Sequence, residues 1–160
     1  MPRLSYVLLT SPIGDLRLVA SPNGLRRVDL PPAGAPENTW VEESTPILAE
    51  TVRQLTEYFA GDRRTFDLPL EPEGTDFQLS VWKVLRAIPF GHTISYGEQA
   101  RRLGDGNKAR AVGSANGRNP LPIVVPCHRV VGADGSLTGF SGGVDAKRWL
   151  LEHEGSLVGA

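Results

Sequence analysis

The chain contains one cysteine, Cys127, which lies in the segment PCHRV at positions 126–130. Thiolate is the nucleophilic form of cysteine, and a neighbouring cation or a histidine that accepts the proton lowers the pKa of the thiol. The adjacent imidazole and guanidinium therefore favour a nucleophile at position 127. The alternative is a structural role, because free cysteine is among the most buried residue types and this one follows an apolar run at 121–125.

A nucleophilic cysteine needs a base, and the base needs a group that orients it. His128 is adjacent, but successive residues on an extended strand point to opposite faces, so we expect a water to bridge the thiol and the imidazole. Glu152 and Glu154 are the nearest carboxylates in the predicted last helix, and spacing does not choose between them. A Cys-His-Glu set also fits a hydrolase, in which water releases an acylated thiol.

Composition argues against a metal site, an internal disulfide and a membrane-spanning segment. Besides Cys127, the nitrogen ligands are His92, His128 and His153, which form no short-spaced pair, so we expect no metal site and no cofactor. One cysteine forms no internal disulfide, and a cytoplasmic location is the simplest expectation. No segment approaches the roughly 18 apolar residues of a membrane span, and the first residues lack a signal-peptide pattern.

The net charge of −1 does not by itself indicate nucleic-acid binding, but the charges are unevenly distributed. Residues 1–96 carry 9 Lys or Arg and 12 Asp or Glu, whereas residues 97–160 carry 8 and 6. Between 97 and 130 only Glu98 and Asp105 oppose six basic residues, which weakly favours an anionic partner. These six are Arg101, Arg102, Lys108, Arg110, Arg118 and Arg129.

Residues 1–70 predict a small α/β lobe. Three short strands at 5–10, 15–20 and 25–30 are separated by the turn sequences SPIG and SPNG. A helix follows, with Thr45 as its N-cap, Pro46 at its first position and Gly61 beyond its end. Its apolar residues recur at helical spacing, so the strands are expected to pack on this helix.

Residues 71–160 predict a second, mainly helical lobe. Thr75 and Gln78 have the spacing of a capping box, and the helix that they begin stops at Pro89. Two shorter helices are expected at 95–103 and 107–115, joined by a glycine-containing turn. This outline is that of a helix-turn-helix, although such pairs are also common packing units.

The second of these short helices is expected to present Lys108, Arg110 and Asn116 outward. Its small residues at 111 and 113–115 allow close approach to a groove of DNA. Prolines at 120, 122 and 126 forbid helix beyond it and predict an extended strand at 123–125 that leads to Cys127. A turn at 132–135, a glycine loop at 139–143 and a helix at 145–154 complete the lobe.

Six motifs in this half resemble the O6-alkylguanine-DNA alkyltransferases in order and spacing. They are IPFG at 88–91, ISYG at 94–97, ARAVG at 109–113, NP at 119–120, PCHRV at 126–130 and SGG at 141–143. The resemblance is strong over about residues 75–155 and extends to the N-terminal lobe only in general layout. It agrees with an α/β (α+β) fold in which a strand-and-helix lobe precedes a lobe with a helix-turn-helix.

The resemblance implies a DNA repair protein that flips O6-alkylguanine out of duplex DNA and transfers the alkyl group to itself. Cys127 would be the acceptor, activated through a water by His128, which Glu154 would orient. Asn119 resembles the hinge residue between the recognition helix and the active-site strand. The thioether product offers water no carbonyl to attack, so each molecule would act once.

The resemblance also implies which residues meet the DNA. Arg110 resembles the residue that enters the duplex and occupies the space of the extruded nucleotide. Tyr96 resembles the residue that presses on the adjacent phosphate. The implied DNA-contacting set is Ser95, Tyr96, Arg110, Ala111, Gly113 and Arg118.

The implied alkylguanine pocket consists of Tyr96, Val130, Phe140 and Ser141. The Ser141 amide would contact guanine O6, and the carbonyls of Cys127 and Val130 would accept from the exocyclic amine. Phe140 stands where the family usually has tyrosine, which removes a hydroxyl donor and predicts slower transfer. The additional N-terminal cysteines of the zinc-binding members are absent.

The implied partner is double-stranded DNA carrying O6-alkylguanine, with O4-alkylthymine as a second candidate lesion. We expect no membrane partner and a monomer in solution, with cooperative assembly on DNA left open. Two alternatives differ in class. A non-catalytic damage sensor is disfavoured by the presence of the cysteine, and a Cys-His-Glu hydrolase would turn over through a transient acyl adduct.

Overall fold

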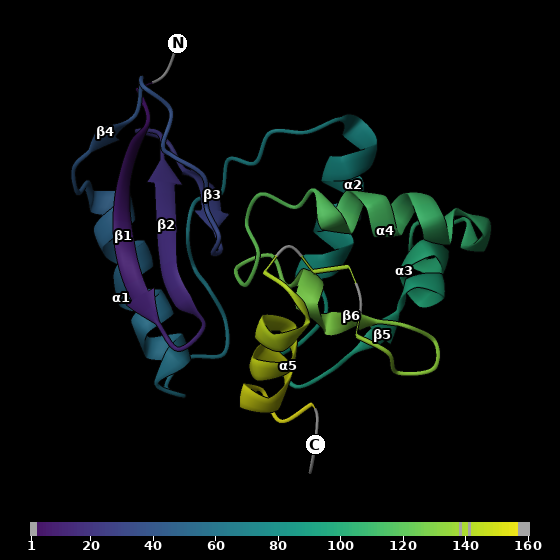
Figure 1. Cartoon of the computed structure of the whole chain (residues 1–160). Coiled ribbons are helices and arrows are strands. Elements are labelled where there is room, and N and C mark those ends of the chain that lie inside the picture. Colours follow the sequence, from purple (N-terminus) through teal and green to yellow (C-terminus); the bar gives the residue numbers. More distant parts are fainter. Residues whose placement is uncertain (1–2, 138, 141, 157–160) are drawn as a thin grey trace. The chain divides into compact units, whose positions relative to one another are not determined.

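The computed structural model describes residues 3–137, 139–140 and 142–156, and it divides the chain into two compact units (Figure 1). The first unit is Met1–Glu73 and the second is Gly74–Ala160. None of the helices in the described part of the chain has both the length and the apolarity of a bilayer span.

The first unit contains a four-stranded sheet in the order β3-β2-β1-β4. The expected strands are confirmed as β1 (Ser5–Ser11), β2 (Gly14–Ala20) and β3 (Leu25–Asp29), which pair antiparallel in sequence order. The fourth strand, β4 (Val41–Glu42), pairs parallel with β1 and was not predicted. Its two residues are too few to show an alternating pattern.

One helix, α1 (Pro46–Phe59), packs against this sheet and begins at the predicted cap. The Thr45 side chain accepts a hydrogen bond from the Leu48 amide, which satisfies one of the free N–H groups of the first turn. Leu48 and Leu55 of the helix, and Leu16 and Leu18 of β2, are fully buried. Each such side chain contributes roughly 1.5–3 kcal/mol to folding.

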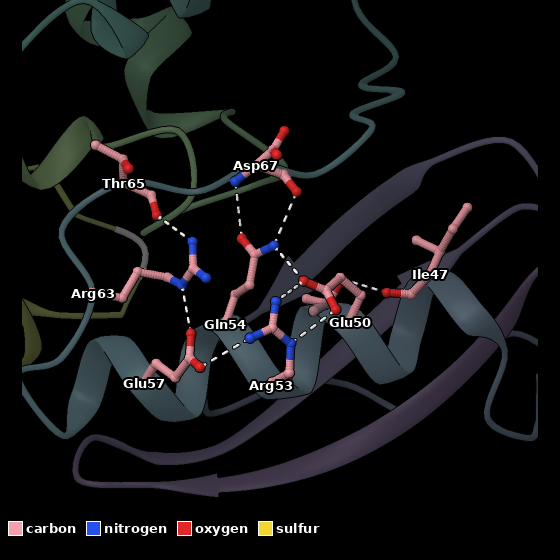
Figure 2. A network of polar contacts seen from close by, with 9 residues as sticks. Ile47, Glu50, Arg53, Gln54, Glu57, Arg63, Thr65 and Asp67 are labelled. Atoms are coloured by element: carbon pink, nitrogen blue, oxygen red, sulfur yellow. Dashed lines mark hydrogen bonds and ion pairs between the residues drawn. The ribbon is translucent and has the colours of Figure 1, made fainter.

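Polar side chains of α1 hold the segment that follows the helix (Figure 2). The Gln54 amide nitrogen donates to the Asp67 carbonyl at 2.9 Å, and the Asp67 N–H donates back to the Gln54 oxygen at 2.9 Å. Arg63 donates to Glu57 at 2.8 Å and to the Thr65 carbonyl at 3.0 Å. Because Gln54 is buried, this exchange fixes residues 63–67 against the helix.

The second unit is mainly helical, as predicted, and carries a small parallel pairing of β5 (Ile94–Ser95) with β6 (Val130–Val131). Two short 3-10 turns are η1 (Gly106–Lys108) and η2 (Cys127–Arg129). The α-helices of this unit are α2 (Asp76–Arg86), α3 (Tyr96–Arg102), α4 (Ala109–Gly117) and α5 (Val144–His153).

The helices α3 and α4 form the expected helix-turn-helix and are joined through η1. Their contact is polar: Gln99 donates to the Asn116 oxygen at 2.9 Å, and Asn116 donates to the Gln99 oxygen at 2.7 Å. Trp82 of α2 also donates to the Ala115 carbonyl at 2.9 Å. The expectation that Asn116 points outward is therefore wrong, because it lies one helical turn after buried Val112 and shares its face.

The expected strand at 123–125 is also wrong, because residues 121–125 form a compact turn. Asn119 spans this turn: its amide nitrogen donates to the Val125 carbonyl at 2.8 Å, and its oxygen accepts from the Leu121 amide at 2.9 Å. Ile123 has a φ of 75°, a value that β-branched residues rarely adopt. The positive φ of Ile123 and the two Asn119 bonds turn the chain back on itself, so this apolar segment makes no ladder.

Candidate active site

Cys127 begins the 3-10 turn η2, directly after the turn that Asn119 spans. Its amide donates to the Val125 carbonyl at 2.8 Å, and the residue is 8% exposed. Because Cys127 and His128 lie on a helical turn, the alternation of faces expected for a strand does not apply to them. The Val125 carbonyl accepts from both the Asn119 side chain and the Cys127 amide, so Asn119 helps to fix the backbone that carries the thiol.

The environment of Cys127 raises the pKa of its thiol. Burial is the largest cause, while the Asn119 side chain and the positive charge of Lys147 lower the pKa in part. The expectation that adjacent groups lower the thiol pKa is wrong in its net direction, because burial of the thiol outweighs the groups that lower it. Cys127 is accordingly a thiol in the resting protein at neutral pH.

His128 is fully buried and is bonded to a buried carboxylate. Its Nε2 lies 2.8 Å from Oε2 of Glu154, the residue that caps the C-terminus of α5. Glu152, the other carboxylate that sequence spacing left open, is exposed. The structure thus brings Glu154 to the histidine that follows the cysteine.

The protonation states of this pair follow from their surroundings. Burial opposes ionisation of Glu154, but the bonds to His128 and Arg129 outweigh it and lower the carboxyl pKa to about 2. Burial is also the main reason why the pKa of His128 is lowered, and it outweighs the opposing effect of Glu154. A neutral imidazole beside a carboxylate carries its proton on Nε2, which leaves the Nδ1 lone pair available to accept a proton. Nδ1 is buried and has no hydrogen-bond partner among the described residues.

Sequence reasoning placed Arg129 only as a cation near the thiol. In the structure its Nε donates to Oε1 of Glu154 at 2.8 Å, and Nη2 donates to Oε2 at 3.0 Å. Nη1 donates to the Ile88 carbonyl, two residues beyond α2, at 2.7 Å. The guanidinium therefore joins η2, the end of α5 and the end of α2.

Lys147 is a second buried cation that sequence reasoning missed. It is 1% exposed, and its Nζ donates to the Val130 carbonyl at 2.6 Å. The same nitrogen lies 6.0 Å from the centre of the Tyr96 ring. The signal was present in the sequence, since Lys147, Leu151 and Glu154 recur at helical spacing and share the buried face of α5.

The expected pocket residues come from three segments of the second unit. Tyr96 begins α3, Val130 begins β6, and Phe140 lies in the loop before α5. Phe140 meets His128 edge-on, with ring centres 6.5 Å apart. Gly139 has a φ of 69°, and a Cβ at this position would lie 3.3 Å from the Tyr96 hydroxyl, so glycine allows the loop to approach this ring. Ser141 lies outside the described residues.

The expected DNA-contacting residues lie on the helix-turn-helix. Ser95 caps α3 by accepting from the Glu98 amide at 3.1 Å. Arg110, Ala111 and Arg118 are exposed on α4 and at its C-terminal end. Glu98 pairs with Arg101 at 3.0 Å and with Arg102 at 3.1 Å, so part of the expected positive patch is neutralised within α3. Gly113 of α4 is half-buried beside the ring of Tyr96.

The described residues contain no group of three His, Cys, Asp or Glu side chains arranged to hold a metal ion. The site is instead a buried thiol, a neutral imidazole, a carboxylate and two cations. Such a set can accept the proton of the thiol and stabilise the thiolate that remains. This is the chemistry of a protein that uses a cysteine to accept a transferred group, and here the cysteine belongs to the same unit as a helix-turn-helix.

Comparison with known proteins assigns the family. The model "6-O-methylguanine DNA methyltransferase, DNA binding domain" matches residues 76–156, and the model for the ribonuclease-like domain of the same family matches residues 4–72. The chain therefore belongs to the 6-O-methylguanine DNA methyltransferase family.

Relatives and solved structures agree with this assignment. The chain is 47% identical over 154 residues to a methylated-DNA--protein-cysteine methyltransferase of Methanosarcina acetivorans, covering 94% of this chain and 98% of the relative. The crystal structure of Mycobacterium tuberculosis OGT in complex with DNA superposes with a TM-score of 0.89 at 46% identity, covering 95% and 93% of the two chains. A methyltransferase structure from Methanococcus jannaschii gives a TM-score of 0.66 at 28% identity.

Proposed function

We propose that this protein repairs DNA by removing the alkyl group from O6-alkylguanine in a duplex and retaining it on Cys127. The observation that carries the proposal is the buried thiol next to a neutral His128 whose Nε2 is bonded to Glu154. Family membership supports DNA as the partner, because a relative at 46% identity has been crystallised with DNA.

The reactive carbon of the lesion is inside the base stack, so the nucleotide must leave the duplex before reaction. We assign the first contact with DNA to α4, whose exposed Arg110 would occupy the space that the nucleotide leaves. Arg118 would also contact the DNA, and the small residues Ala111 and Gly113 would let the helix approach it closely. Tyr96, the first residue of α3 after its N-cap Ser95, would press on the neighbouring phosphate. Unstacking costs a few kcal/mol, and a poorly paired damaged base reduces that cost.

Transfer then needs one proton to leave the thiol. The Cys127 proton passes through a water to Nδ1 of His128, and Glu154 stabilises the imidazolium that forms. The thiolate attacks the alkyl carbon, an S–C bond forms, and the C–O6 bond breaks with its electrons on guanine. Guanine takes up one proton as it leaves and the His128 imidazolium gives one up, so the proton that left the thiol ends on guanine and the imidazole returns to its neutral form.

The flipped base would be recognised by backbone groups and by the rings around it. The carbonyls of Cys127 and Val130 would accept from the exocyclic amine, and the Ser141 amide would donate to O6. Phe140 would line the pocket without a hydroxyl donor. The product is a thioether, which water does not hydrolyse, so the protein is consumed in one reaction.

The test is intact-protein mass spectrometry after mixing with a duplex that contains O6-methylguanine. We expect one methyl group per protein molecule, mapped to Cys127, with no adduct on Cys127→Ala. That variant is expected to keep its affinity for duplex DNA within about threefold, because the thiol makes no phosphate contact. The unmodified duplex serves as the matched control.

The competing functions give different results in the same experiment. Tight binding to the damaged duplex without any mass increase would identify a damage sensor. Repeated turnover of an amide or ester, with a transient acyl mass on Cys127, would identify a hydrolase. Either result would overturn the proposed alkyl transfer.

A further inference from the structure

Oε2 of Glu154 is shared by two donors. It lies 2.8 Å from His128 Nε2 and 3.0 Å from Arg129 Nη2, while Oε1 accepts from Arg129 Nε at 2.8 Å. A two-bond fork of this kind fixes the plane of a carboxylate as well as its position. The orientation of the imidazole therefore depends on the guanidinium as well as on the carboxylate.

The charge of Arg129 matters as much as its geometry. The charged and titratable groups around His128 are Cys127 and Arg129 from η2, Lys147 from α5 and Glu154 at the C-terminal cap of α5. A buried carboxylate alone would favour imidazolium, because opposite charges attract strongly where water is excluded. A second cation on the same carboxylate reduces that attraction. Arg129 and Lys147 both lower the pKa of His128.

We propose that Arg129 is a positioning residue for alkyl transfer: it fixes Glu154 and compensates its charge, so that His128 stays neutral with Nδ1 free to accept the Cys127 proton. This inference rests on the proposed function. The Arg129 guanidinium bonds Glu154 and the Ile88 carbonyl, and its effect on the reaction passes through Glu154.

A purely structural role is the alternative, because Arg129 also donates to the Ile88 carbonyl and is only 6% exposed. The chain offers a matched control in the other unit. Arg17 is 8% exposed, bonds Asp29 through Nε at 3.0 Å and Nη2 at 2.9 Å, and donates to the Gly34 carbonyl. Its loss should affect folding in a similar way without reaching His128.

The first measurement is the protonation of His128 by NMR, with ¹⁵N-labelled histidine. In the wild-type protein at pH 7 we expect the neutral form with its proton on Nε2. In Arg129→Gln the pKa of His128 is expected to rise by about one unit, whereas Arg129→Lys, which keeps the charge, should shift it much less. An unchanged pKa in Arg129→Gln, or imidazolium in the wild type at pH 7, would overturn the proposal.

The second measurement is the single-turnover rate of methyl transfer at saturating DNA between pH 5 and 9. In Arg129→Gln the acid limb of the rate profile should move to higher pH, which lowers the rate about tenfold on the limb and much less at pH 8.5. Arg17→Gln should leave the shape of the profile unchanged. An equal loss at every pH in Arg129→Gln would indicate a structural role instead.

Failure of the proposed alkyl transfer can be told apart from failure of the proposed role of Arg129. If wild-type protein forms no methyl adduct, the proposed function fails, and the NMR titration still reports whether Arg129 controls the protonation of His128. If Arg129→Gln does not fold, Arg129→Lys and the wild-type tautomer at pH 7 still decide the proposal. Thermal unfolding of each variant shows whether it folds before any rate is compared.

Discussion

A buried thiol with a raised pKa is a weak nucleophile, and this suits an acceptor that is used once. A thiolate exposed at neutral pH would react with any soft electrophile and exhaust the protein. Here burial keeps Cys127 protonated. Neutral His128 would accept the thiol proton only once a flipped nucleotide occupies the proposed pocket. Reactivity is then coupled to the presence of substrate.

Phe140 lies beside the proposed base, His128. Its ring meets His128 edge-on at 6.5 Å, and Phe140 is one of the residues that we propose line the alkylguanine pocket. We expect Phe140→Tyr to raise the single-turnover transfer rate about three- to tenfold, because a hydrogen bond to the leaving guanine contributes roughly 0.5–1.5 kcal/mol. Rapid-quench kinetics with the methylated duplex measures this change.

The control for that change is Phe66→Tyr in the first unit, where Phe66 packs beside Tyr58. It adds the same hydroxyl in a unit that holds none of the residues expected at the pocket, and it should leave the rate unchanged. An unaltered rate in Phe140→Tyr would mean that the pocket does not use a donor on this side.

Within the site, the identity of the groups was predictable and their electrostatics were not. The motif around Cys127 indicated the nucleophile and His128, because both are adjacent in sequence. The direction of the thiol pKa depends on burial by residues distant in sequence. Glu154, the partner of Arg129, is 25 residues away in the sequence, so only the folded chain shows that the guanidinium bonds this carboxylate.

At the scale of elements, local signals predicted the helix starts. Thr45, Thr75 and Ser95 each accept from an amide three residues on, a contact that depends only on neighbouring residues. The turn at 121–125 was mistaken for a strand because the Asn119 side chain replaces the sheet partner. Strand β4 was missed because its pairing with β1 is not local.

The contact between α3 and α4 leads to a prediction about stability. Asn116→Ala leaves the buried Gln99 amide without two bonds, and we expect the free energy of unfolding to fall by about 1–3 kcal/mol. Urea unfolding measures the loss. The exposed Asn107 of η1 is the matched control, and Asn107→Ala should change stability by less than about 0.5 kcal/mol.

A double variant tests the reason for this loss. Gln99→Leu combined with Asn116→Leu removes both polar groups, so the pair should be more stable than the sum of the two single changes predicts. Strict additivity would mean that the reciprocal bonds do not couple α3 to α4.

Across the whole molecule, the two units bury different kinds of residue. The first unit buries its core between one helix and one side of a sheet, and the residues expected at the DNA and at the thiol all belong to the second unit. The second unit buries four ionisable groups, His128, Arg129, Lys147 and Glu154, around that thiol. Its stability should therefore depend on pH more strongly than its net charge suggests.

The sign of that dependence follows from the direction of each shift. Glu154 has a folded pKa of about 2, below its ordinary 4.5, so its stabilising contribution is present above pH 4.5 and is lost as the pH falls toward 2. The folded pKa of His128 is also lowered, so the fold favours the neutral form and this contribution is lost as the pH falls below 6.5. The pKa of Cys127 is raised, so its contribution is lost as the pH rises above 9.

These three groups give a stability plateau between about pH 6.5 and 9 and a decline on acidification that steepens below pH 4.5, while burial of Lys147, which lowers its pKa, adds stability toward higher pH. Urea unfolding across this range measures it, and Glu154→Gln should remove a pH-dependent part on the order of 3 kcal/mol. Glu50 of α1 is the matched control, because its carboxyl pKa is also lowered to about 2, chiefly by Arg53, but solvent screens this surface pair. If Glu50→Gln flattened the acid limb as much as Glu154→Gln, the pH dependence would arise from surface charge and not from the buried site.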